Sequence, residues 1–343
     1  MVWIIRYPWS IACDKDTLVL LMSLGDVYAL HEKTCPSLIP CSRNSSTFVH
    51  QLKKTRYNIM AKHRLRYLPI GEPTEFDRRV MELERKGAIV PTRDLIKTPE
   101  QIEGIRRAGV VNTGVLDTVE KEIRAGMTTL QIDKICREYC ADHGAIPACL
   151  GYGGFPMSVC TSINEVVCHG IPKAKDVLRD GDIINVDFTT ILDGYYADAS
   201  RMFIIGETTP AKEQLVRVTR ECLEVGIRAA RPWCDVNDIG RAIEPYAHQH
   251  GYGVVRDLTG HGVGLKFHED PEVCHFAQRK RGMILVPGMV FTIEPMINMG
   301  TWKVFIDADD PYGWEVITGD LKPSAQWEHT FVMTEEGPEI LTH

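Results

Sequence analysis

The sequence of 343 residues lacks the hallmarks of several protein classes. Its longest apolar run is far shorter than the roughly 20 residues that cross a bilayer, so no membrane span is expected. Arg6 and Pro8 interrupt the apolar N-terminus, which therefore makes a poor secretory signal. The 11 cysteines are odd in number and include no Cys-x-x-Cys pair, which favours reduced thiols in the cytoplasm over a disulfide framework. A formal net charge of −7 argues against general binding to nucleic acid, DNA included.

The first 97 residues carry few signals, and we expect residues 1–97 to be an N-terminal extension and linker before a catalytic domain at 98–343. One candidate zinc site consists of four residues whose spacing fits no standard finger, His31, Cys35, Cys41 and His50. The run 53–66 has no acidic residue and contains six basic ones, Lys53, Lys54, Arg56, Lys62, Arg64 and Arg66. Such a run is either a solvated linker or a docking site for ribosomal RNA.

The most informative segment, residues 182–201, predicts two β-strands joined by a tight Asp-Gly turn. With that dipeptide as the hairpin loop, Asp187 faces Ser200 and Asp198 faces Thr189. Side chains alternate along a strand, so the two aspartates are diagonal neighbours on one face, with Cβ atoms about 7–8 Å apart or somewhat less. Two carboxylates aimed together are costly without a cation. The hairpin therefore predicts half of a metal site.

Three further candidate ligands lie downstream. His261 stands between two glycines, where backbone can approach a ligand closely. Glu294 and Glu328 each lie in a largely apolar, strand-like run, 289–295 and 324–333. With the two aspartates they form an oxygen-rich set for two divalent ions, from among manganese, iron, cobalt and zinc; one imidazole among four carboxylates suits the first three better than a thiolate-based structural zinc site. Such a centre can make a hydroxide nucleophile at neutral pH, so hydrolysis is the predicted reaction class.

The chain resembles the type I methionine aminopeptidases in the order of these five residues and in the phrases around them. The resemblance covers residues 98–343 and includes SVCTSINEVVCHGIP at 158–172. Only 26 positions separate His268 from Glu294, which leaves no room for the helical domain that type II enzymes insert there. The resemblance implies removal of the initiator methionine from nascent polypeptides with a small second residue, by attack of a metal-held hydroxide on the first peptide bond. It leads us to expect a cytoplasmic monomer that acts on nascent N-termini.

The resemblance also implies roles for individual residues. His169, in the CHGIP phrase, would contact the substrate, and His268, in KFHEDP, would hydrogen-bond near the scissile peptide. Glu294 would bind metal and accept the proton of the attacking water. The methionine pocket would be lined by Cys149, Tyr152, Phe155, Cys160, Phe267 and Trp314. Sulfur and aromatic surfaces suit a thioether side chain.

Helix signals recur in the same order twice along the chain. The predicted starts are at Thr98, Thr128, Thr209 and Asp235–Asp238, and the second and fourth helices are predicted to end at His143-Gly144 and His250-Gly251. Each helix pair is followed by strands that carry candidate ligands, as in an internal duplication. We therefore expect an α/β (α+β) fold of two pseudo-twofold-related halves, with antiparallel sheet and flanking helices. In the resembled family this is the pita-bread fold.

The remaining histidines are expected to be structural. His143 and His250 fall at predicted helix ends, where capping is the usual role. His329 follows Glu328 and should point to the opposite face of its strand. His275 is expected in a loop or at the pocket rim.

Two other functions stay open. An Xaa-Pro aminopeptidase or prolidase shares the fold and the five ligands, but the CHGIP phrase, the cysteine and aromatic pocket and the WEHT ending at 327–330 differ from the proline-specific pattern. A non-catalytic, ribosome-associated binder on the same fold would have lost ligands, whereas all five are present here.

Overall fold

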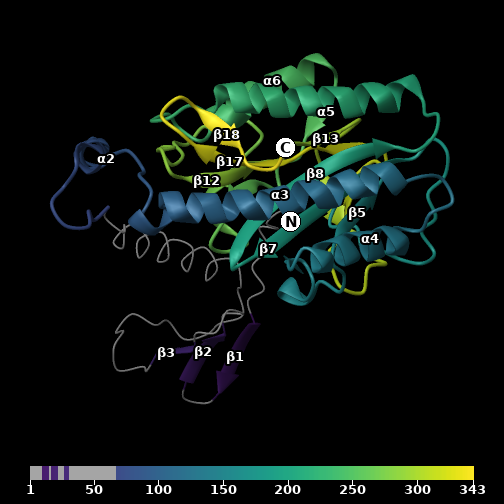
Figure 1. Ribbon diagram of the computed structural model, residues 1–343, viewed down its shortest axis with the longest axis horizontal. Coiled ribbons are helices and arrows are strands. Elements are labelled where there is room, and N and C mark those ends of the chain that lie inside the picture. Colours follow the sequence, from purple (N-terminus) through teal and green to yellow (C-terminus); the bar gives the residue numbers. More distant parts are fainter. Residues whose placement is uncertain (1–9, 15–16, 22–26, 31–66) are drawn as a thin grey trace. The chain divides into compact units, whose positions relative to one another are not determined.

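The computed structural model describes residues 10–14, 17–21, 27–30 and 67–343 (Figure 1). Residues 67–343 form one compact unit, and the three short N-terminal strands belong to another. These strands form an antiparallel sheet in chain order: β1 (Ser10–Asp14), β2 (Thr17–Leu21) and β3 (Val27–Leu30). The four candidate zinc residues and the basic run at 53–66 lie outside the described residues, so both stay predictions.

The helices begin where capping residues predict them. The Thr98 and Thr128 side chains accept hydrogen bonds from the N–H groups of Gln101 and Gln131, and each glutamine side chain accepts in return from the cap backbone. The helices of residues 67–343 are α2 (Glu75–Arg85), η2 (Arg93–Leu95), α3 (Pro99–Glu122), α4 (Thr129–Asp142), η3 (Tyr152–Gly154), α5 (Pro210–Ala229) and α6 (Asp238–Gln249). His143 and His250 are the C-cap residues of α4 and α6, as predicted.

Antiparallel strands fill the space between the two helix pairs. Around the predicted hairpin lie β4 (Ile146–Pro147), β5 (Cys160–Ile163), β7 (Ile183–Leu192) and β8 (Tyr195–Ile204), with β7 paired to the other three. A second sheet has the order β11 (Glu269–Val273), β10 (Gly260–Gly262), β12 (Val290–Ile293), β17 (His329–Met333), β18 (Pro338–Ile340). Two small sheets have the orders β16 (Ser324–Gln326), β13 (Met296–Asn298), β9 (Gly253–Val254) and β14 (Val304–Ile306), β15 (Val316–Thr318), β6 (Val166–Cys168).

Each helix pair covers its own hydrophobic core. In Figure 1 the α5–α6 pair lies above the strands, and the α3–α4 pair lies across and below them. One core packs α3 and α4 against β7 and β8 through Val115, Leu116, Ile132, Cys136, Val186 and Phe188. The other packs α5 and α6 against β12 and β17 through Leu215, Cys222, Ile239, Ile243, Ile293 and Phe331. Two cores under two helix pairs agree with the duplication read from the sequence.

The hairpin register is the one predicted. Asp187 pairs with Ser200 and Thr189 with Asp198 across β7 and β8. The predicted strand at 324–333 is interrupted instead: β16 ends at Gln326, β17 begins at His329, and Glu328 lies in the break. There its backbone exchanges hydrogen bonds with Ser200, at N···O distances of 3.2 and 3.4 Å. The break therefore joins the second half of the unit to the hairpin of the first.

The segment before α3 packs onto the same unit. Tyr67 and Val80 are buried in the core that also packs α5 and α6 against β12 and β17, and the Tyr67 hydroxyl donates to Asp77. The Lys97 N–H donates to the Gly288 carbonyl at 2.8 Å. In the part of the chain that the structure describes, no helix has the length and apolar character of a membrane span.

Candidate metal centre and substrate pocket

The hairpin supplies the first two candidate ligands. Asp187 and Asp198 lie on neighbouring strands and are 1% and 0% exposed. The Thr189 hydroxyl donates to Asp198 Oδ1 at 2.8 Å, and the Asp198 N–H donates to Thr330 Oγ1 at 3.0 Å. Because strand pairing fixes both backbones, the two carboxylates are held on one face of the hairpin.

The second half of the unit supplies the other three. His261 lies in β10, Glu294 directly follows β12, and Glu328 lies in the β16–β17 break. The Thr292 hydroxyl accepts from the His261 N–H at 3.0 Å and donates to Glu294 Oε1 at 2.7 Å. The Gln326 amide donates to the other Glu294 oxygen at 3.1 Å. Two neutral side chains thus orient one candidate ligand from both sides.

The candidate ligand atoms converge. Since a carbonyl oxygen only accepts, the 2.9 Å contact from His261 Nδ1 to the Gly262 oxygen assigns the proton to Nδ1 and the lone pair to Nε2. That Nε2 lies 3.8 Å from Asp198 Oδ2 and 3.7 Å from Glu294 Oε1. Ligand atoms of Asp198, His261 and Glu328 all lie within 4.8 Å of one another. The structure therefore brings residues from both halves to one point.

These residues fit a divalent cation. Neither carboxylate oxygen of Glu328 has a hydrogen-bond donor among the described residues, although the side chain is fully buried. Burial and the neighbouring carboxylates raise the pKa of Glu328 well above its usual value. Burial likewise raises the pKa of Glu294 strongly and that of Asp187 to about 7, with the Asp198 charge adding to both shifts. A bound divalent cation would offset the free-energy cost of ionising these buried carboxylates and keep them charged.

His275 supports the centre from behind, a role that the sequence did not suggest. It lies in a loop, as predicted, but it is 1% exposed and not at a pocket rim. Its Nε2 accepts a hydrogen bond from the Glu294 N–H at 3.0 Å. Burial and the nearby His261 lower its pKa to about 3, so the ring stays neutral and can accept.

The six predicted pocket residues lie together beside the carboxylate–histidine cluster, which is the set of five candidate ligands. Cys149, Phe155, Cys160 and Phe267 are buried in one hydrophobic cluster against which Trp314 packs. The Phe155 and Trp314 rings meet edge to face at 5.8 Å between centroids. The Tyr152 and Phe267 rings lie 4.7 Å apart. This lining of sulfur and aromatic surface suits a flexible apolar side chain.

The two non-ligand histidines lie at the pocket, and His268 also lies next to the candidate ligand His261. His268 Nδ1 lies 2.8 Å from the Tyr152 hydroxyl, and its ring is centred 4.2 Å from that of His261. His169 is buried, with a left-handed backbone at φ 57°, and its ring meets Trp314 edge to face at 5.6 Å. Glu315 supports this loop because its carboxylate accepts from the Ile171 N–H at 2.9 Å.

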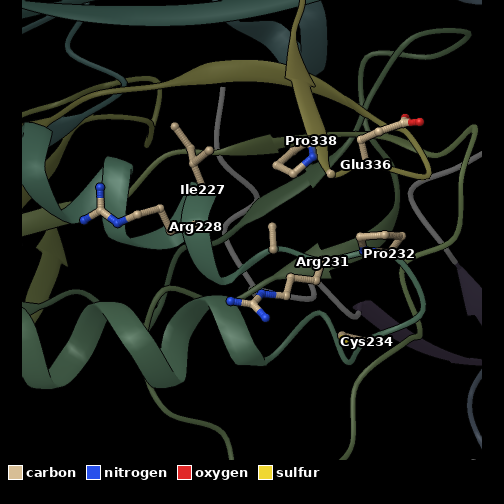
Figure 2. Close-up of a pocket in the computed structure, with 9 residues that line it drawn as sticks. Ile227, Arg228, Arg231, Pro232, Cys234, Glu336 and Pro338 are labelled. Atoms are coloured by element: carbon tan, nitrogen blue, oxygen red, sulfur yellow. The ribbon is translucent and has the colours of Figure 1, made fainter.

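A separate pocket of about 500 Å³ lies at the C-terminal end of α5 (Figure 2). It is lined by residues 227, 228, 230–232, 234 and 336–338, none of which is a predicted site residue. Figure 2 shows the Arg228 and Arg231 guanidinium groups and the Glu336 carboxylate extending in different directions. Since no polar groups converge among its lining residues, we place the chemistry at the carboxylate–histidine cluster.

The chain is similar to known metallopeptidases. The model of metallopeptidase family M24 matches residues 103–335. Methionine aminopeptidase A of Synechocystis sp. is 51% identical over 242 residues, which cover 71% of this chain and 94% of that protein. The crystal structure of methionine aminopeptidase from Rickettsia prowazekii superposes with a TM-score of 0.70 at 44% identity, covering 72% of this chain and 99% of that chain. The prolidase from Pyrococcus horikoshii OT3 reaches a TM-score of 0.57 at 20% identity, covering 73% of this chain and 63% of that chain, a likeness of fold alone.

Proposed function

The chain belongs to the methionine aminopeptidases of metallopeptidase family M24, and from this premise we propose how its residues perform the reaction. It is a metal-dependent hydrolase with the pita-bread fold, and it removes the N-terminal methionine of polypeptides. The observation that carries the proposal is the convergence of Asp198, His261 and Glu328 beside the cysteine and aromatic pocket.

The metal ligands that we propose are Asp187, Asp198, His261, Glu294 and Glu328. This set would hold two divalent ions, which when bound acidify a water molecule and polarise the first peptide carbonyl. Support comes from the burial of all five side chains and from the Glu328 oxygens, which have no donor among the described residues. Manganese, iron, cobalt and zinc all stay candidates, because affinity order and availability decide between them.

The chain's own groups would bind the substrate and move the proton. Glu294 accepts the proton of the attacking water, in the orientation that Thr292 and Gln326 impose on its carboxylate. His169, beside Trp314, and His268, beside Tyr152, contact the peptide. The thioether of methionine enters the cluster of Cys149, Phe155, Cys160, Phe267 and Trp314, with Tyr152 beside it.

Three finer points belong to the same proposal. Residues 98–343 form the catalytic part, the enzyme is a monomer, and the preferred second residue is small.

Docking of the basic run at 53–66 to ribosomal RNA also stays a prediction. Ribosome co-sedimentation that did not change when the six basic residues were neutralised would remove it. Light scattering after size-exclusion chromatography would measure the oligomeric state.

A peptide panel tests the proposal. Manganese-loaded protein should release methionine from Met-Ala-Ser, act much more slowly on Met-Leu-Ser, and leave Ala-Pro-Ser intact. Cleavage of the proline peptide with little methionine release would favour the Xaa-Pro aminopeptidase alternative. Metal-loaded, folded protein that cleaved none of the three would favour the non-catalytic binder.

A further inference from the structure

The loop that carries Phe267 and His268 is held by the carboxylate of Glu269. Glu269 is the first residue of β11, directly after the loop. One of its oxygens accepts the N–H groups of both Leu265 and Lys266 at 2.8 Å. These two bonds fix the backbone just before Phe267, as a carboxylate does when it caps a helix.

The other Glu269 oxygen forms an ion pair with the Lys97 ammonium. The two side chains are only 1% and 7% exposed, so the charges lie away from solvent. Lys97 is itself fixed, because its ammonium donates to the Asp94 carbonyl at 3.3 Å and its N–H to the Gly288 carbonyl at 2.8 Å. Removing one partner of such a buried pair leaves the other charge uncompensated.

A shift of this loop would move two substrate-facing groups together. Phe267 is 3% exposed and contacts Tyr152 and Tyr196, with centroid distances of 4.7 and 6.2 Å. His268 is half-buried and is bonded to the Tyr152 hydroxyl. A displacement of about 1 Å at a reacting group can cost about a hundredfold in rate.

We propose that Lys97 and Glu269 are positioning residues that fix the loop carrying Phe267 and His268 against the substrate. The inference rests on the proposed roles of Phe267 and His268. Lys97 precedes the region that the family model matches, residues 103–335, so the segment before α3 contributes to the site through this contact.

The test uses Lys97→Met, Glu269→Gln and the double variant of the full chain, loaded with manganese. Each single variant should lower kcat/KM for Met-Ala-Ser by about tenfold to a hundredfold at unchanged metal content. The double variant should recover to within about threefold of wild type, because both charges are gone and the glutamine oxygen still accepts the loop N–H groups. Hydrogen exchange at Leu265 and Lys266 should quicken in the single variants and slow again in the double.

Two controls separate positioning from general stability. Tyr67→Phe removes a buried hydrogen bond to Asp77 in the same N-terminal segment and should lower the unfolding temperature without changing kcat/KM. His268→Ala tests the premise. Suppose that His268→Ala slows hydrolysis, while the two single variants, like Tyr67→Phe, have a lower unfolding temperature and an unchanged kcat/KM. The Lys97–Glu269 pair then only stabilises the fold, which overturns the inference and leaves the proposed function in place. If His268→Ala hydrolyses peptide at the wild-type rate, the proposed role of His268 fails and the inference falls with it.

Discussion

Asp187→Asn should stabilise the metal-free protein at neutral pH although it removes a proposed metal ligand. Burial raises the pKa of Asp187 from 3.8 to about 7, so the folded state holds this proton more tightly than the unfolded chain. That proton makes its whole contribution to the free energy of unfolding below pH 3.8, and the contribution is lost as the pH rises through 7. A shift of about 3 units at about 1.4 kcal/mol per unit amounts to about 4 kcal/mol.

Asparagine is neutral throughout, so the variant avoids this loss. The free energy of unfolding of the variant, relative to wild type, should rise by about 4 kcal/mol between pH 4 and pH 8 in the presence of a chelator. Saturating manganese should reverse the order, because the cation stabilises the wild-type carboxylate and binds the variant less tightly.

Urea denaturation followed by circular dichroism, at several pH values with and without manganese, measures both effects. Asp142→Asn is the matched control, because Asp142 is an exposed aspartate on α4. A difference in the free energy of unfolding between Asp187→Asn and wild type that stayed constant from pH 4 to pH 8 would show that the folded state does not hold the Asp187 proton more tightly.

Three further changes probe separate parts of the account. Glu294→Gln should leave the fold intact and slow methionine release by about 10²–10⁴-fold, because an amide accepts no proton; wild-type turnover would remove its proposed role. His169→Ala should keep the metal content and lower kcat/KM by about tenfold to a hundredfold, and loss of metal in elemental analysis would make His169 a ligand instead. Burial lowers the pKa of His329 from 6.5 to about 4, so protonation of this one side chain should cost the folded state about 3 kcal/mol as the pH falls from 6.5 to 4. His329→Gln should remove this cost, so its free energy of unfolding in urea titrations should rise relative to wild type as the pH falls from 6.5 to 4. A difference from wild type that did not change with pH would contradict the assignment.

Local sequence rules predicted much of the framework. The Asp-Gly turn sets the register of β7 and β8, so the pairing of Asp187 with Ser200 follows from counting residues. The helix starts at Thr98 and Thr128 follow from threonine caps whose glutamine partners stand three residues later. These features depend on neighbours in the chain, which is why sequence alone was sufficient for them.

Some residues that orient the candidate metal ligands can be identified from the two-residue alternation of side chains along a strand. Thr292 and Gln326 each stand two residues before a proposed glutamate ligand, and both bond to the Glu294 carboxylate. Alternation along a strand puts residues i and i+2 on one face, so this signal could have identified them. His275 offered no such signal, because a loop brings it behind Glu294 from 19 positions away.

Contacts between distant segments could not be predicted. The break at Glu328 depends on Ser200, from the other half of the unit, and the Lys97–Glu269 pair joins residues 172 positions apart. Nothing near Lys97 in the sequence distinguishes it from a linker lysine. Such pairings are set by the packed fold, and local propensity carries no information about them.

The most direct test of the central claim is methionine release from Met-Ala-Ser by chelated protein reconstituted separately with manganese, iron, cobalt and zinc. The chelated protein should release no methionine, and at least one metal should restore the release. Release that persisted in the chelator, or that no metal restored in a folded and metal-loaded protein, would contradict it.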